Sequence, residues 1–197
     1  MKDTKTVAFG KRRKSNPFAL IFCVLVNFIL FGICYYLHLP IRLEHVGSLY
    51  AVLSVGTGAG LVVAVVSQLI YSLFYFSFWG MLLLIPVLLI LLFAATAKKY
   101  GWLGTLISDL GAMTVACVIS AVLTILISFL IGRRFMVNTP FWDMYNTLAR
   151  HLMLSKFKDS FYIVGGYACF NTAATWLLGT LAFALTPKNT GFGLRGR

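Results

Sequence analysis

Three side chains able to bind a small molecule, Arg42, Glu44 and His45, lie close together between two long apolar stretches of the chain. Burial of ionisable groups beside apolar segments is costly, so their presence there favours a functional role. Arg42 could pair with a carboxylate or phosphate of a substrate, and Glu44 or His45 could hydrogen-bond a heterocycle. The alternative is an ion pair between Arg42 and Glu44 that anchors a loop at lipid headgroups.

Three amide side chains stand inside apolar stretches, where each must find a hydrogen-bond partner. Asn27 and Gln68 are explained most simply by hydrogen bonds between helices, which need no substrate. Asn171 stands midway along the last apolar stretch. For Asn171 two roles are open, a hydrogen bond between helices and a place in a binding pocket.

The segment 140–158 carries two aromatic candidates, Trp142 and Tyr145. With the apolar residues that follow them they recur at helical spacing, which predicts an interfacial amphipathic helix. The alternative is a lid over a substrate site, in which Trp142 or Tyr145 stacks on a planar ring.

The sequence contains no recognisable catalytic or metal-binding set. His38, His45 and His151 have no cysteine or carboxylate at ligand spacing on a shared helical face. The four cysteines lie in apolar stretches and form no Cys-x-x-Cys pair. We therefore expect a protein that is not an enzyme and that uses no metal or cofactor.

The elements that must position these residues are membrane helices. Of the 197 residues, 60% are hydrophobic and 11% are charged, whereas soluble domains carry about 25% charged residues. The longest uncharged stretches are Phe18–Leu39, Val46–Ala97 and Ser160–Pro187, and one spanning helix needs roughly 20 residues. This composition excludes a water-soluble globular protein and predicts a polytopic helical membrane protein.

The stretch Val46–Ala97 is too long for one span, and its glycines predict where it breaks. Gly56, Gly58 and Gly60 mark one break, and residues 77–80 mark a softer one. We therefore predict an all-α bundle of six transmembrane helices within a membrane domain 17–187, between tails 1–16 and 188–197. The six helices are expected at about 17–39, 43–55, 57–76, 79–97, 103–132 and 159–186.

The charge balance is strongly basic, with 17 Lys and Arg against five acids and a net charge of +12. The basic residues lie mainly in tails and loops, where cytoplasmic retention and anionic lipids explain them better than nucleic acid does. Five helices and six helices distribute these charges equally well. With six, both termini of this multi-pass cell-membrane protein are cytoplasmic, and Asp109 is a hydrated acid near Lys98 or Lys99.

The segment Leu39–Gly60 resembles the signature region of the S components of energy-coupling-factor (ECF) transporters. Leu43–Ser48 stands where that family has a pattern like L-D-x-I-G-T, and Gly56–Gly60 stands where it has a turn like G-P-W-x-G-A. The family's S components are six-helix membrane subunits that bind vitamins or other small micronutrients. They work with a transmembrane T component and two cytoplasmic ATPases.

The resemblance implies roles for particular residues. Arg42, Glu44 and His45 lie in the loop that the family uses near its binding pocket, and Asn171 lies in the last helix, which also contributes to that pocket. Small residues on one side contact the T component in this family. Those at matching places here are Ala19, Cys23, Gly56, Gly58, Gly60 and Ala64; the alternative for the glycines and Ala64 is close approach of the chain's own helices.

A second class of function remains open. The same fold could serve as a non-transporting membrane scaffold or sensory module that binds no solute. Replacement of Glu44, His45 and Asn171 by alanine distinguishes a transport subunit from a scaffold, because only a transport subunit would lose uptake.

Overall fold

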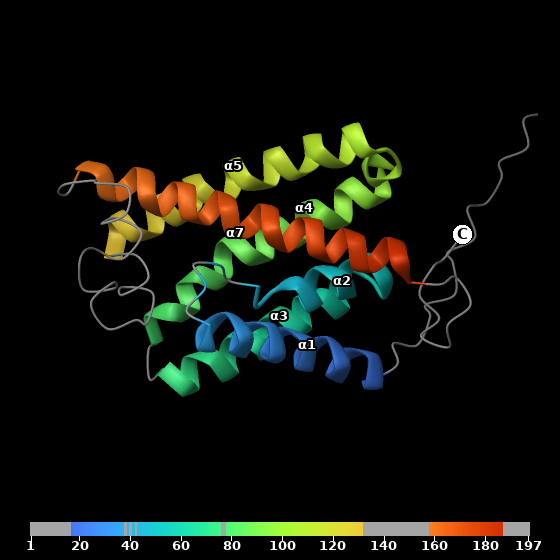
Figure 1. The fold of residues 1–197 in the computed structure, drawn as a ribbon, viewed down its shortest axis with the longest axis horizontal. Coiled ribbons are helices and arrows are strands. Elements are labelled where there is room, and N and C mark those ends of the chain that lie inside the picture. The colour runs from blue at the N-terminus through green and yellow to red at the C-terminus, as the bar shows by residue number, and fades with distance from the viewer. Residues whose placement is uncertain are drawn as a thin grey trace, which may run out of the picture.

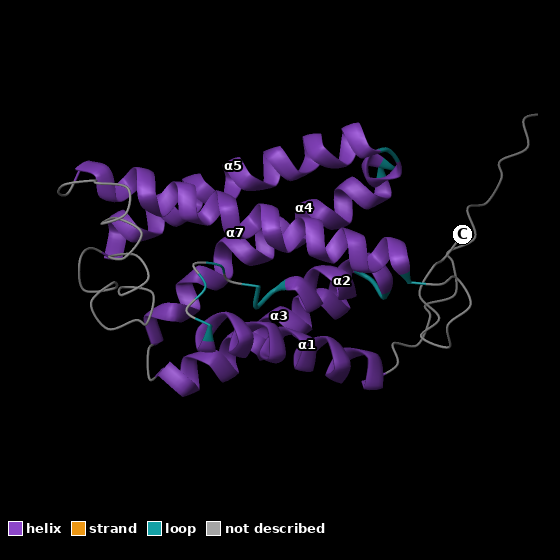
Figure 2. Ribbon diagram, viewed as in Figure 1, coloured by secondary structure: helices purple, strands orange, loops and turns teal. Residues whose placement is uncertain are grey.

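The computed structural model describes residues 17–37, 39, 41, 43–75, 78–131 and 158–186. In these residues the chain forms six α-helices and two short 3-10 helices, and no strand (Figure 1). In chain order they are α1 (Pro17–Tyr36), α2 (Val46–Ser54), α3 (Thr57–Tyr75), η1 (Phe78–Leu83), α4 (Leu84–Lys99), η2 (Trp102–Gly104), α5 (Leu106–Ile131) and α7 (Lys158–Leu185). Two residues separate α2 from α3 and two separate α4 from η2, and these short connections are drawn in teal (Figure 2).

Four helical stretches are long and apolar enough to cross a membrane. They are Pro17–Tyr36, Met81–Lys99, Leu106–Ser128 and Val164–Leu185, with mean hydropathies between 1.4 and 2.6. The prediction of an all-helical fold is confirmed for the described residues, and these four helices suggest a membrane protein. The apolar part of α3, Thr57–Leu73, is shorter than these four.

The helix α2 differs from the predicted helix 43–55. It begins only at Val46, after a turn closed by a hydrogen bond from Val46 N to Leu43 O, and it has nine residues. Nine residues extend about 14 Å, which is less than half of the roughly 30 Å of bilayer hydrocarbon. α2 alone is therefore too short to cross a membrane.

The chain folds back on itself between α2 and α3. α2 ends at Ser54 and α3 begins at Thr57, and Gly56 between them has φ +143°. Further along α3, a Cβ on Gly60 would lie 2.1 Å from Val52 Cγ2 and 2.8 Å from the carbonyl oxygen of Ser48. Because Gly60 has no side chain, α3 can return along α2 at close backbone distance.

The short helix α2 lies in the centre of the bundle. All of its residues except Tyr50 are buried, and it packs against α1, α3, α4 and α7. The main core cluster draws on α2, α3, α4, α5 and α7, and its buried members are Leu49, Val52, Leu53, Ala64, Leu84, Leu91, Ala94, Ala97, Ala112, Ala116 and Trp176.

The helices α5 and α7 form the longest helix pair and run in opposite directions (Figure 1). A Cβ on Gly165 would lie 2.8 Å from Ile125 Cδ1, so the glycine allows the two helices to approach closely. Near the middle of both helices, Cys117 Sγ donates to the carbonyl oxygen of Cys169, and Cys169 Sγ donates to that of Cys117, each at 3.4 Å.

Candidate functional site

The buried side chain of Asn27 on α1 joins three helices. Its Nδ2 donates to Ser48 Oγ on α2 at 2.9 Å and to Ser67 Oγ on α3 at 3.0 Å. Its Oδ1 accepts a hydrogen bond from the backbone N–H of Gly47 at 2.7 Å. The interpretation of Asn27 as an amide that links helices is confirmed.

The contact with Gly47 explains how α2 can begin inside the bundle. The first N–H groups of a helix have no partner within the helix, and within a bilayer core an unpaired one costs several kcal/mol. Asn27 supplies the partner for Gly47. A Cβ on Gly47 would lie 2.2 Å from the carbonyl oxygen of Cys23, so only glycine permits this approach.

Glu44 and His45 lie immediately before α2 and form an acid–imidazole pair. Glu44 is 2% exposed, and its Oε1 lies 3.5 Å from His45 Nε2, whose side chain is 12% exposed. Both residues lie at the N-terminus of α2, where the helix dipole has its positive end. The structure thus places two of the three residues of the predicted cluster next to each other, with Glu44 buried and His45 partly buried.

The same level of the bundle carries aromatic rings. Phe31 lies one helical turn beyond Asn27 on α1, and Tyr71 lies one turn beyond Ser67 on α3. Their ring centroids are 4.6 Å apart, and that of Phe28 is 5.0 Å from Tyr71. The helix α2 runs antiparallel to α1 and α3, and Glu44 stands three residues before Gly47. The acid and these rings therefore lie on the same side of the Asn27 hydrogen bonds.

Cys34, near the end of α1, lies beside the segment that precedes α2, since its sulfur contacts the backbone of Leu43. The sequence analysis did not single out Phe31, Tyr71 or Cys34 as neighbours of the site. The sequence offered one signal for the two rings: Phe31 stands four residues after Asn27, and Tyr71 stands four residues after Ser67, which is helical spacing.

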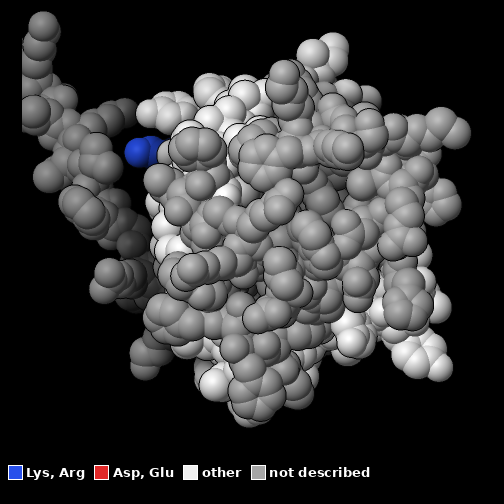
Figure 3. Space-filling view, turned by 90° about the vertical axis from the view of Figure 1, so that its left-hand side faces the viewer, with Lys and Arg blue, Asp and Glu red and all other residues white. Residues whose placement is uncertain are grey.

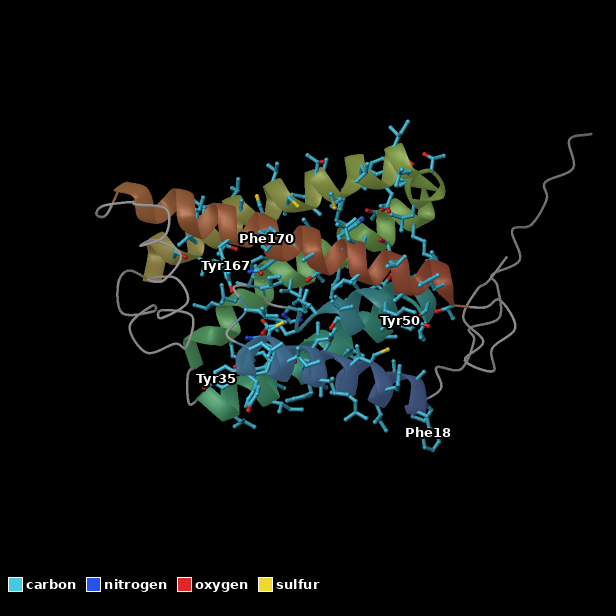
Figure 4. All side chains as sticks on the ribbon, in the orientation of Figure 1. Phe18, Tyr35, Tyr50, Tyr167 and Phe170 are labelled. Carbon is cyan, nitrogen blue, oxygen red and sulfur yellow. The ribbon has the colours of Figure 1, made fainter. Side chains whose placement is uncertain are left out.

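Asn171 lies in the half of α7 nearest to this level. α7 runs in the same direction as α2, because a Cβ on Gly179 would lie 2.7 Å from Leu49 Cδ2 while Tyr50 Oη lies 3.1 Å from Thr186 Oγ1. Asn171 precedes Gly179 by eight residues, or about 12 Å along the helix, and so lies toward the Glu44 end. Figure 4 shows its neighbours Tyr167 and Phe170 in that half.

The other end of α2 is held by α4. Lys98 Nζ donates a hydrogen bond to the carbonyl oxygen of Leu53 and lies 5.4 Å from the ring centroid of Phe183. Asp109 accepts a 2.8 Å hydrogen bond from Trp176 Nε1. The expected pairing of Asp109 with Lys98 is therefore replaced by contacts that connect α5 to α7 and α4 to α2.

Most of the small residues expected to contact a partner lie inside the chain. Ala19, Cys23 and Ala64 are buried, and Gly60 packs against α2. The small size of these four residues serves the packing of the chain's own helices, and the contact of the six residues with a partner stays a prediction. Gly58 is exposed and Gly56 is half-buried.

Some predicted features lie outside the described residues. They are Arg42, Trp142, Tyr145 and the tails 1–16 and 188–197. Among the residues that are described, no three His, Cys, Asp or Glu side chains come together as metal ligands.

Comparison of the chain with models of protein families, with curated proteins and with solved structures gives no match. The site is therefore judged on its own chemistry. It offers a buried carboxylate, an imidazole and aromatic rings, which suit the binding of a small polar molecule.

Proposed function

We propose that the chain is the membrane-embedded substrate-binding (S) subunit of an ECF-type importer that takes up a vitamin-like or other small micronutrient. The observation that carries the proposal is the burial of Glu44 beside His45 at the start of α2. The same two residues stand in the part of the sequence that resembles the family's signature region.

The burial of Glu44 supports a binding role on energetic grounds. Ionisable side chains inside membrane proteins are expensive and mark pathways or ligand sites. The site also follows a recurring plan of transporters, in which a short helix begins within the membrane and its N-terminus adjoins the substrate. Glu44 and His45 are the ligand-binding residues of this proposal, and Asn171 extends the site from α7.

The arrangement of the helix ends supports a six-span topology. α1 begins, α4 ends and α7 ends at one end of the bundle (Figure 1). In a six-span topology, the nine residues of α2 and the segment before them would together make one crossing. The basic residues that adjoin this end in the sequence are Lys2, Lys5, Lys11, Arg12, Arg13, Lys14, Lys98, Lys99, Lys188, Arg195 and Arg197.

These residues make up eleven of the 17 Lys and Arg. Because positive residues are retained on the cytoplasmic side, the proposal places this end and both termini in the cytoplasm, with the chain in the cell membrane. The Glu44 level lies toward the opposite end, which would face the outside.

The proposed partners are a T component and two cytoplasmic ATPases. Gly56–Gly60 covers the turn after α2 and the start of α3, whereas a nucleotide-binding glycine loop follows a strand. Energy for uptake would therefore come from the partners. No docking role is assigned to the buried small residues.

The test is co-expression of the tagged chain with a T component and its two ATPases, followed by purification and uptake assays with radiolabelled water-soluble vitamins. The proposal predicts a stable complex and uptake of one vitamin, lost in Glu44→Ala with the melting temperature little changed. Tyr50→Phe, in the middle of α2 where the hydroxyl contacts Thr186, is the matched control that keeps uptake.

A scaffold or sensory module predicts a different result. Glu44→Ala and Asn171→Ala would then leave every uptake rate unchanged while the fold stays intact. Failure to retain any T component, together with the absence of saturable vitamin binding, would refute the transport proposal.

A further inference from the structure

We infer that Cys117 on α5 and Cys169 on α7 form a redox site, at which a lipid-soluble oxidant of the quinone class joins the two thiols in a disulfide. Both cysteines are free in the structure. The inference does not depend on the proposed transport function. It is carried by the way in which the antiparallel helices α5 and α7 face each other.

The register of α5 against α7 places the two cysteines opposite each other. Ala121 faces Gly165, because the Cβ position of Gly165 lies 3.9 Å from Ala121 Cβ. In an antiparallel pair, a step of one turn back along α5 corresponds to a step of one turn forward along α7. The residues one turn away from Ala121 and Gly165 are Cys117 and Cys169, so these two also face each other.

The contacts of the two sulfur atoms agree with this register. Cys117 Sγ donates to the carbonyl oxygen of Cys169, and Cys169 Sγ donates to that of Cys117, each at 3.4 Å. A side chain in a helix leans toward the N-terminus of the helix, whereas each carbonyl points toward the C-terminus. Since the helices are antiparallel, both contacts form together when the two cysteines lie directly opposite. Two turns further on, Trp176 Nε1 donates to Asp109 at 2.8 Å, which fits the same register.

The separation of the two helices suits a disulfide. The Cβ atoms of disulfide-bonded cysteines lie about 3.5–4.5 Å apart. At the turn next to the cysteines, the Cβ position of Gly165 lies 3.9 Å from Ala121 Cβ. Rotation of both cysteine side chains, which takes the sulfurs from the carbonyls toward each other, therefore forms the bond with little movement of either helix.

The surroundings of the two thiols favour an uncharged oxidant. Both cysteines lie inside the apolar stretches Leu106–Ser128 and Val164–Leu185, and both are partly exposed. Their neighbours Val118 and Phe170 are more than half exposed, so apolar surface adjoins the thiols. Seen from the end of the bundle where α7 begins, the described residues show no acidic atom, and basic atoms appear only at the edge of the view (Figure 3). These surroundings admit a quinone dissolved in the bilayer.

The step is a two-electron oxidation. The two S–H bonds break and one S–S bond forms. Two protons and two electrons pass to the quinone, which becomes a hydroquinone. The product joins α5 to α7 covalently, and a reducing dithiol restores both thiols by exchange.

The experiment treats the purified full-length chain in lipid nanodiscs with duroquinone, whose fully methylated ring resists addition of thiols. Free thiols are then labelled with a maleimide in the denatured protein and assigned by mass spectrometry, before and after reduction with dithiothreitol. Of the four cysteines, Cys117 and Cys169 should lose their labelling together, and their peptides should be joined within a single chain. Cys23 and Cys34 should keep their labelling, and reduction should restore all four.

Two double variants test the register. Cys23→Ser with Cys34→Ser keeps the facing thiols and should form the disulfide as the unmodified chain does. Cys117→Ser with Ser120→Cys has the same composition as the unmodified chain but moves one thiol about 4.5 Å along α5, and it should not form the disulfide. Cys117→Ser keeps a donor for the carbonyl of Cys169, so this variant should be folded in thermal melting. If it is unfolded, Cys169→Ser alone should abolish the cross-link.

Three results would overturn the inference. They are full labelling of both cysteines after oxidation, a cross-link between two chains in place of one within the chain, and an equal yield of disulfide in Cys117→Ser with Ser120→Cys. The outcome is separable from the test of the proposed function. A chain that forms the internal disulfide but binds no vitamin keeps the redox site and loses the transport role.

Discussion

The backbone N–H of Gly47 donates a 2.7 Å hydrogen bond to Oδ1 of Asn27, twenty residues earlier in the chain. Through this bond α1 provides the partner that the first turn of α2 lacks. The amide group of the same side chain binds the hydroxyls of Ser48 and Ser67. One side chain therefore satisfies polar groups of two other helices in the interior.

Replacement of Asn27 tests this relationship. Asn27→Ala leaves the Gly47 N–H and two buried hydroxyls without their partner, and each unsatisfied group costs about 1–3 kcal/mol. We expect a lower melting temperature in detergent and weaker ligand binding, because the start of α2 loses its support. Thr114→Ala is the control, since Thr114 is exposed and bonds only within its own helix; an equal loss in both variants would contradict the prediction.

Gly47→Ala tests the close approach of α2 to α1. The new methyl group would lie 2.2 Å from the carbonyl oxygen of Cys23, which is backbone and can move only with the helix. We expect a marked loss of stability, measured by thermal unfolding of the purified protein.

Gly111→Ala is its matched control on α5. No atom lies within 4 Å of the position of its Cβ, and alanine is favoured over glycine inside a helix by about 1 kcal/mol. Gly111→Ala should therefore unfold at the same or a higher temperature. If Gly47→Ala has the same melting temperature as Gly111→Ala, then α2 does not lie against α1.

Gly56→Ala tests the backbone of the turn between α2 and α3. Gly56 has φ +143° and no neighbour within 4 Å of its Cβ position, so any effect arises from backbone conformation alone. Such a conformation costs a residue with a side chain about 1–3 kcal/mol. We expect a loss of that size in unfolding measurements, and a smaller effect for Gly58→Ala, which lies in a helix with open space around it.

The neighbouring residues Lys98 and Lys99 should respond differently to the same substitution. Lys98→Met removes the donor to the Leu53 carbonyl and the contact with the Phe183 ring, and one hydrogen bond to a charged group contributes about 1.5–3 kcal/mol. Lys99→Met keeps both contacts and should leave the melting temperature nearly unchanged. Equal melting temperatures for the two variants would show that Lys98 does not hold the end of α2.

The sequence predicts the helices of this protein better than their contacts. Long uncharged stretches lead directly to helices, and the glycines at 56–60 mark the break between α2 and α3, because both signals are local. The late start of α2 was missed, since it depends on the turn from Leu43 to Val46 and on Asn27. The spacing of Ala19 and Cys23 shows that one face of α1 carries small side chains, but it does not show that α2 and α3 cover that face.

The candidate site was predictable to a similar extent. Glu44 and His45 stand out as ionisable residues beside apolar segments, and the structure buries Glu44 and partly buries His45. The rings of Phe31 and Tyr71 resemble any other apolar residues of a membrane helix in the sequence. Their place near the acid depends on the return of α3 along α2, which brings residues 40 positions apart together.

The attachment of α2 at both ends has a consequence for how the protein opens. A nine-residue helix is too short to persist by itself in water, yet Asn27 binds its first turn and Lys98 its last turn. Its amide protons should therefore exchange with deuterium only when α1, α3 and α4 separate as one cooperative unit. The shortest α-helix described in the chain would then report the global unfolding of this part of the bundle.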